Sequence, residues 1–171
     1  ISEIEEELLN KDPDIFINFE EKRQIGENDS YICELIRNDL IEKFISYITV
    51  KNIKISSTIK RSIFETNSFL VKKMPSLIEY SAFFGSIQIF QYLKLNKVKL
   101  KPSLWLYTIH GRNPEMIHIL EENHVVPEDK TYEKCLKEAI KFHHNEIADY
   151  IKNNLIDDKV INYNLDNKFN E

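Results

Sequence analysis

The chain has 171 residues and is 42% hydrophobic and 11% aromatic, which is enough to build the core of one folded domain. Its net charge of −5 and its lack of a basic stripe argue against nucleic acid as a partner, because such binding depends on lysines and arginines that meet phosphates. The three glycines are too few for phosphate-binding loops or for a fold rich in tight hairpins. No run approaches the ~20 apolar residues that span a bilayer, so we expect no membrane partner.

Residues 1–30 predict an N-terminal helical cap made of one or two helices. Apolar residues recur at helical spacing within residues 1–11. Asp12 followed by Pro13 predicts the start of the next helix, since aspartate caps a helix and proline suits its first position. The apolar face of that helix would consist of Ile15, Phe16 and Phe19.

Residues 31–155 contain a weak internal repeat. Ser76–Val98 and Ser103–Val125 share an apolar pattern at an offset of 27 residues, and Lys134–Asn154 follows at an offset of 31. A pair of short helices recurring at a spacing near 30 is typical of a helical solenoid, which presents a surface to other macromolecules.

A divergent earlier copy of this unit precedes an insert. It consists of SYICELIR (Ser30–Arg37) and NDLIEKFISYI (Asn38–Ile48), with a short turn at Asn38-Asp39 that we expect to cap the second helix. In the insert, residues 49–74, we expect extended linker and one short helix near Ile59–Glu65.

Boundary residues recur in the later units, because proline favours helix starts and glycine favours helix ends. They are Pro75-Ser76, Gly85-Ser86, Pro102-Ser103, Asn113-Pro114, Asp129 or Thr131, and the inter-helix turn His143-His144-Asn145. Residues 156–171 are interpreted as a polar C-terminal extension with a candidate stub helix near 157–163.

These residues resemble a known family. The stretch SLIEYSAFFGSIQIFQYL resembles a degenerate ankyrin repeat, with Ser76 at the threonine position and Gly85 at the turn glycine. From about Tyr31 to Ile151 the chain is similar to an ankyrin-like domain of unknown function expanded in trichomonad protozoa, through SIFETNSFL, IEYSAFFGSIQIF, PSLWLYTIH and KFHHNEIADYI. The resemblance implies an all-α solenoid of stacked antiparallel helix pairs with irregular repeats, and further ankyrin repeats after such a domain.

The chain also departs from the ankyrin pattern. Glu79 replaces the histidine that ties neighbouring ankyrin repeats together, and the residues typical of the β-hairpin fingers are absent. We therefore expect helix pairs joined by irregular connectors rather than by regular fingers.

The ankyrin alignment predicts a concave protein-binding face. It places there Tyr80, Phe83, Phe84, Tyr107, His110, Gly111, Lys141 and Phe142. Grouped aromatic side chains favour partner binding, because they dominate interface energetics. The alternative is that Phe83 and Phe84 pack against the adjoining unit or the insert. Trp105 stands opposite Ile78 in the repeat, and we expect it to belong to the core.

Catalytic and metal chemistry is weakly indicated. Cys33 and Cys135 lie in apolar helical patterns and are expected to be buried free thiols of a cytoplasmic protein. Cys135 with His143 or His144 is the one nucleophile pair suggesting a hydrolase, and His110 and His118 lack the spacing of a zinc site. We expect the two adjacent histidines to lie, protonated, near helix carbonyl ends.

The sequence therefore favours a non-catalytic protein–protein interaction module without cofactor or metal. The alternative is a structural N-terminal cap of a longer ankyrin-repeat array, and a Cys/His hydrolase is the remote third reading.

Overall fold

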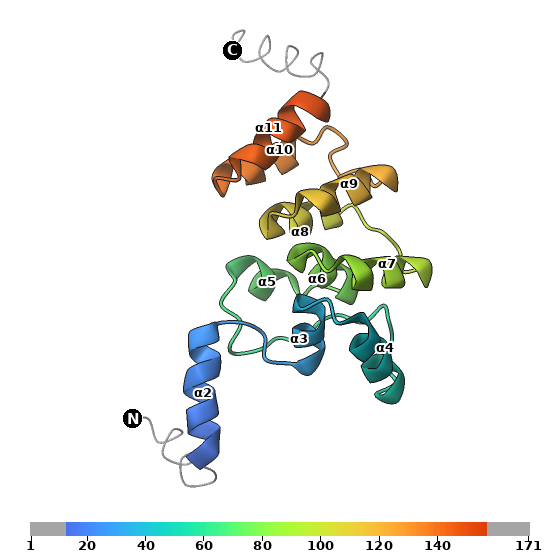
Figure 1. Cartoon of the computed structure of the whole chain (residues 1–171). Coiled ribbons are helices and arrows are strands. Elements are labelled where there is room, and N and C mark those ends of the chain that lie inside the picture. Colours follow the sequence, from blue (N-terminus) through green and yellow to red (C-terminus); the bar gives the residue numbers. More distant parts are fainter. Residues whose placement is uncertain (1–12, 157–171) are drawn as a thin grey trace.

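A computed structural model describes residues 13–156, and within that range the chain is entirely helical, with ten helices and no strand (Figure 1). The nearest approach to a strand there is a single antiparallel bridge between Thr58 and Ser76. The predicted all-α class is confirmed for the described residues. The predicted helices at residues 1–11 and the stub helix near 157–163 lie outside them.

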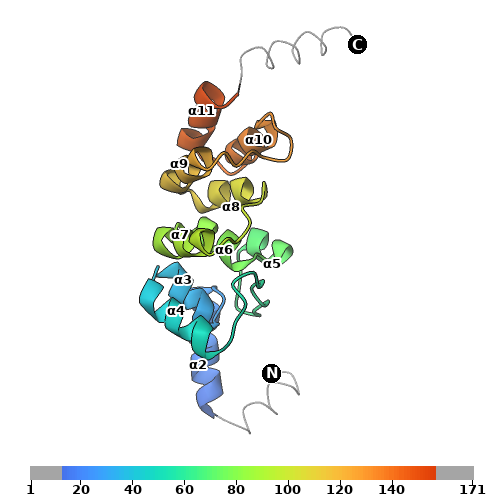
Figure 2. The same cartoon turned by 90° about the vertical axis from the view of Figure 1, so that its right-hand side faces the viewer.

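Eight of the helices form four pairs. These are α3 (Tyr31–Arg37) with α4 (Ile41–Val50), α6 (Leu77–Phe84) with α7 (Ile87–Leu95), α8 (Leu104–Gly111) with α9 (Pro114–Glu122), and α10 (Glu133–Lys141) with α11 (Asn145–Asn154). The two helices of each pair contact one another, and the first helices also contact in the order α3, α6, α8, α10. Figures 1 and 2 show the pairs one above another along the molecule.

Helix starts follow local capping chemistry at the predicted boundaries. Before α6, the Ser76 backbone N–H donates to Glu79 Oε2 at 2.8 Å, which completes a capping box. Before α9, Asn113 Oδ1 accepts from the Met116 N–H at 3.0 Å. Both candidate caps of α10 contribute, since Asp129 accepts from the Lys134 N–H at 2.8 Å and Thr131 from the Glu133 N–H at 3.5 Å.

The Asp39 carboxylate caps a helix of the neighbouring unit, where we predicted a cap for its own. Its two oxygens accept from the Gln88 and Ile89 N–H groups of α7, each at 3.0 Å. No side chain caps α4, whose N-cap position is Leu40. The positive φ of Asp39, 49°, lets the turn project this carboxylate towards the next pair.

The helix predicted at Ile59–Glu65 is wrong, because that segment is irregular, with a turn at Ile63-Phe64, and its backbone bonds to distant parts of the chain. The Ile59 N–H donates to the Pro75 carbonyl at 2.7 Å, and Asn28 Nδ2 donates to the Lys60 carbonyl at 2.8 Å. The helix of the insert is instead α5 (Ser68–Lys73), which begins after Asn67. Asn67 Oδ1 accepts from two N–H groups of its first turn.

Helix α2 (Pro13–Ile25) begins at the predicted proline and is joined to the insert. The Phe19 ring meets the Phe64 ring edge-on at 5.2 Å, and the Gly26 carbonyl accepts from the Thr66 N–H at 2.9 Å. The predicted roles of Ile15 and Phe16 lie outside the described side chains.

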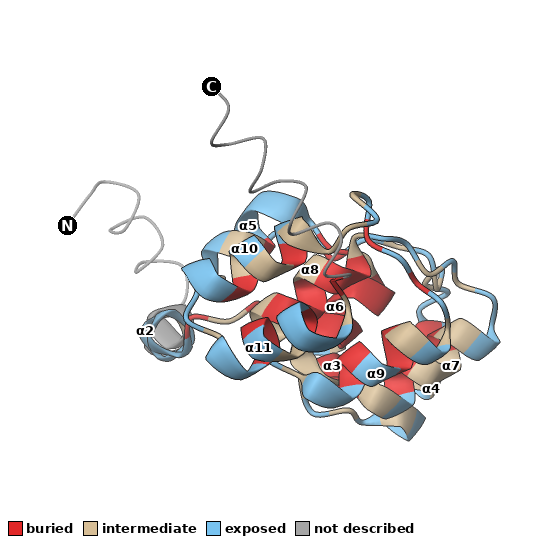
Figure 3. Cartoon of the chain, turned by 90° about the horizontal axis from the view of Figure 1, so that it is seen from above, coloured by how far each residue is buried: buried red, intermediate tan, exposed pale blue. Residues whose placement is uncertain are grey.

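Buried residues gather where the helices face one another, most densely on α6 and α8 (Figure 3). Trp105 is fully buried as predicted, and its indole N–H donates to the Val125 carbonyl at 2.6 Å. Cys33 and Cys135 are buried free thiols, also as predicted. Among the described helices, none combines the length and the apolar composition required to cross a membrane.

Candidate functional site

The predicted binding residues come together at the C-terminal ends of α6, α8 and α10. Tyr80, Phe83 and Phe84 lie on α6, Tyr107 and His110 on α8, and Lys141 and Phe142 at the end of α10. Their rings touch in sequence: Phe83 and Phe84 at 5.0 Å, Tyr80 and Phe84 at 4.7 Å, and His110 and Phe142 at 4.5 Å between centroids. Two of these contacts lie within α6, and the third joins α8 to the end of α10.

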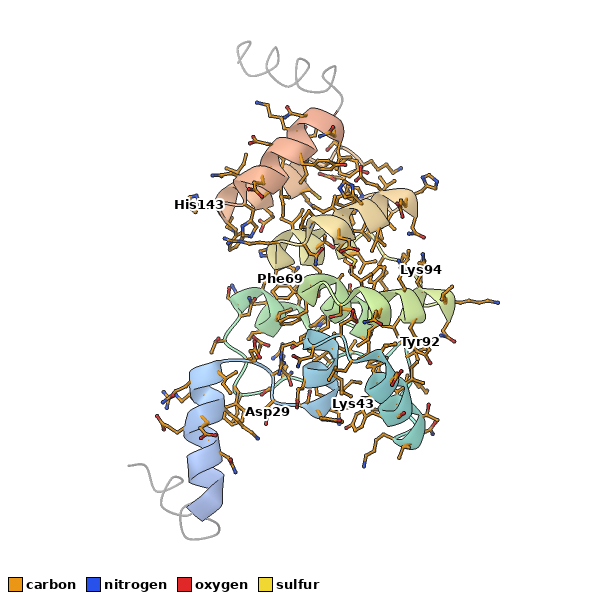
Figure 4. All side chains as sticks on the ribbon, viewed as in Figure 1. Asp29, Lys43, Phe69, Tyr92, Lys94 and His143 are labelled. Atoms are coloured by element: carbon orange, nitrogen blue, oxygen red, sulfur yellow. The ribbon has the colours of Figure 1, made fainter. Side chains whose placement is uncertain are left out.

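Phe69, which the sequence analysis did not single out, joins these rings into one chain. It projects from α5 and stacks on His110 at 3.9 Å and on Phe83 at 6.3 Å, with Tyr107 edge-on at 4.9 Å. Figure 4 shows its label between α5 and α8. We call this chain of rings the aromatic row: Phe69, Tyr80, Phe83, Phe84, Tyr107, His110 and Phe142. The Asn67 cap followed by Phe69-Leu70 is the sequence signal that would have located it.

Most of the aromatic row is interior. Tyr80 is 1% exposed, Tyr107 4% and Phe83 8%, whereas Phe142 is 37% exposed. Phe83 therefore packs against the insert, which was the alternative to an exposed binding residue, because the Phe69 ring of the insert stacks on the Phe83 ring. What remains open is the half-buried Phe84 and the end of the row, where the Lys141 ammonium lies 5.1 Å from the Phe142 ring centroid.

The buried hydroxyl of Tyr80 anchors one end of the row. Arg37 Nη1 donates to it at 3.1 Å and also donates to the Asn28 carbonyl at 2.8 Å. Burial, with the Cys33 thiol nearby, raises the pKa of Tyr80 far above its ordinary value, so the phenol stays neutral. This hydroxyl thus fixes α6 against α3 and is not available as an acid or base.

His110 stands in the middle of the row as a neutral ring. Its Nε2 lies 3.2 Å from Glu138 Oε2 of α10. Burial lowers the pKa of His110, and the opposing attraction of Glu138 does not cancel that effect. A neutral imidazole suits this place, because its face stacks on Phe69.

Glu79 connects α6 to the start of α8. Its carboxylate accepts from the Ser76 hydroxyl at 2.7 Å and from the Ser103 hydroxyl at 2.6 Å. Burial acts to raise the pKa of Glu79, but the hydrogen bonds from Ser103 and Ser76 outweigh it and the pKa is lowered. Glu79 therefore links one helix pair to the next, although the ankyrin pattern would have a histidine at this position.

The residues considered for catalysis are poorly suited to it. Burial raises the pKa of Cys135 to about 12, so this thiol is not a nucleophile at neutral pH. His143 and His144 form the predicted inter-helix turn, but His144 Nδ1 accepts from Arg112 Nε at 2.7 Å. Burial, together with Arg112, lowers the pKa of His144, so the protonated imidazole we expected there is wrong for this residue. No group of three His, Cys, Asp or Glu residues in the described range is arranged to hold a metal ion.

Comparison with protein-family profiles, with curated proteins and with solved structures gave no match to this chain.

Proposed function

We propose that this chain is a non-catalytic protein-interaction module, built as an irregular ankyrin-like solenoid. The observation that carries the proposal is the aromatic row, which runs unbroken from α6 through α5 and α8 to α10 and emerges at Phe142. The row consists of buried rings that end in an exposed aromatic side chain, Phe142, and a lysine, Lys141. Aromatic and cationic side chains on a well-packed support are typical of interface hot spots.

The helix-pair arrangement supports the ankyrin-like part of the proposal. First helices contact first helices from pair to pair, and the equivalent positions Ile78 and Trp105 are both buried at these junctions. Glu79 supplies the polar link between units through Ser103. A stack of this kind presents one continuous side to a partner while each unit contacts only its neighbours.

The test is capture of a partner from a matched cell lysate by the parent chain and by Phe142→Ala/Lys141→Ala. Both side chains are exposed, so the variant should keep the parent's circular dichroism and melting temperature. Leu95→Ala, which truncates a 77%-exposed side chain on α7, is the matched control. We expect a partner retained by the parent and the control and lost by the double variant. Equal capture by all three would contradict the proposed surface.

A second candidate function, the structural cap of a longer array, is favoured by one observation at the end of the stack. Ile140 of α10 is 57% exposed, whereas the equivalent positions Ile109 and Ala82 of the two preceding units are fully buried. In those units the next helix pair packs against the first helix. The exposed face of α10 would receive a further pair in the same way.

The cap is tested with Ile140→Lys. In this chain the substitution should change the free energy of unfolding by no more than ~0.5 kcal/mol, since the side chain is already exposed. In a longer protein that carries a following helix pair, the same substitution should lower stability by about 2 kcal/mol, because the site would then be buried. Equal effects in both settings would contradict the cap.

A further inference from the structure

The modest net charge of −5 conceals an uneven distribution along the chain, and the expectation that it has no basic stripe is wrong for residues 50–114. Residues 50–114 contain eleven lysines and arginines but only two acidic residues, Glu65 and Glu79. Acidic residues outnumber basic ones on both sides of this segment. The basic segment coincides with the insert, α5 to α8 and the connector between α7 and α8.

The basic residues of this segment are not neutralised inside the molecule. The lysines and arginines that form salt bridges among the described residues are Lys22, Arg37, Lys137 and Lys141, so none of the eleven takes part. Ten of the eleven have an exposed or half-buried side chain on the insert or on the stretch from Lys94 to Lys101. Unpaired lysines at this density repel one another, which favours an anionic partner.

A groove of about 390 Å³ is lined by two of these basic residues, Lys73 and Lys101. It crosses the connectors that precede α6, α8 and α10, with Thr58, Pro102 and Pro127 among its lining residues. Lys73, Lys101 and Lys134 line it, one from α5, one from the connector and one from α10. We call it the connector groove.

The connector groove has apolar as well as cationic walls. Met74, 43% exposed, and the half-buried Phe69 form part of one side. The carboxylate of Glu79 also reaches this groove, but its oxygens already accept from Ser76 and Ser103. Glu79 also feels the positive charge of Lys101, whereas Lys73 takes part in no salt bridge among the described residues. The groove therefore combines apolar contact area with lysines that form no salt bridge there.

We propose that the connector groove binds an acidic, extended peptide segment of a partner protein. The inference rests on the proposed function and adds the chemistry of the partner. Carboxylates of the peptide meet Lys73 and Lys101, and its apolar side chains contact Met74 and Phe69. Charge complementarity of this kind steers association and selects partners.

Nucleic acid fits the groove less well. Trp105 and Tyr107 line it but are 0% and 4% exposed, so their faces are not open for bases to stack on. Glu128 and Asp129 lie at the same groove and repel a continuous run of phosphates. A peptide can alternate carboxylates with apolar side chains, so it can place carboxylates at the lysines and apolar side chains beside these acids.

The experiment measures fluorescence anisotropy of a labelled ten-residue peptide rich in glutamate and leucine, titrated with the whole chain at low and physiological salt. A peptide with lysine in place of glutamate and a single-stranded ten-nucleotide DNA are the comparison probes. Lys73→Gln/Lys101→Gln is compared with Lys43→Gln/Lys152→Gln, whose exposed lysines lie on α4 and α11 and whose change in net charge is equal.

We expect the acidic peptide to bind more weakly to Lys73→Gln/Lys101→Gln by about 10-fold, to Lys43→Gln/Lys152→Gln by less than about 2-fold, and to the parent more weakly as salt rises. Equal losses in both variants, no binding of the acidic peptide, or tighter binding of the DNA would overturn the proposal. A dimer of the parent that dissociates on Lys73→Gln/Lys101→Gln would assign the groove to a second copy of the chain and overturn it too.

The two proposals fail separately in these experiments. If peptide binding does not depend on the lysines but partner capture still depends on Phe142, the connector groove is not a binding site and the end of the aromatic row is. If peptide binding depends on the lysines but partner capture does not depend on Phe142, the connector groove is a binding site and the end of the aromatic row is not.

Discussion

Glu79 illustrates how one side chain can serve both a helix and a junction. The same carboxylate caps α6 through Ser76 and holds Ser103 at the start of α8. Hydrogen bonds to an ionised acceptor are stronger than those to a neutral one, so the charge itself contributes to stability. The residue is 9% exposed, which limits competition from water.

We expect Glu79→Gln to lower the free energy of unfolding by about 1–2 kcal/mol at pH 7. Because the folded-state pKa of Glu79 lies below its ordinary value of 4.5, the stabilisation is complete above that pH and is lost as the pH falls through the folded-state pKa. Denaturant titrations of parent and variant at several pH values should therefore converge in acid. Gln88→Ala, an exposed change on α7, is the control; a pH-independent difference for Glu79→Gln would contradict the role of the charge.

Gly111 marks the closest approach between two helix pairs. A Cβ built on it would lie 1.8 Å from the Phe83 carbonyl oxygen, a backbone atom that cannot move without shifting α6. We expect Gly111→Ala to destabilise the chain by more than about 2 kcal/mol, since overpacking forces backbone shifts. Thermal unfolding would measure this, and a variant as stable as the parent would show that the two pairs are free to separate.

At the scale of elements, the insert decides how the predicted face is built. The repeat pattern predicted the helix pairs well, because Pro75-Ser76, Gly85-Ser86 and Asn113-Pro114 carry local capping signals. It could not predict that Ile59–Glu65 would stay non-helical, because that segment takes backbone partners from Pro75 and Asn28, which are distant in sequence. The same long-range packing puts Phe69 over Phe83 and buries side chains that the ankyrin alignment would leave open.

Helix α5 has only six residues and depends on its cap. We expect Asn67→Ala to remove the two first-turn hydrogen bonds and to weaken α5 by about 1 kcal/mol. Hydrogen exchange should then quicken about 5-fold at amides of residues 70–73, while amides of α6 stay unchanged. Asn96→Ala, at the end of α7, is the control. Unchanged exchange in α5 would show that its packing, and not its cap, maintains it.

Across the whole molecule, stability is expected to fall towards the last pair. Among the described helices, α6 and α8 each make extensive contact with first helices on both sides, whereas α10 makes such contact with α8 only. Hydrogen exchange of the parent chain should therefore be slowest in α6 and α8 and faster in α10 and α11. Uniform protection along the stack would contradict nearest-neighbour stability. The sequence showed these repeats, but its total charge did not reveal where the lysines gather, since acidic segments on either side mask them.

The packing of α5 against both α6 and α8 has a consequence for the synthesis of the chain. Phe69 and Phe83 emerge from the ribosome before Tyr107 and His110 do, so the ring gains its α6 neighbour before its α8 neighbours. The basic stretch around it emerges at the same time. Released chains truncated just before residue 104 would therefore expose an aromatic and cationic segment to chaperones, and released chains that extend past residue 111 would cover the ring.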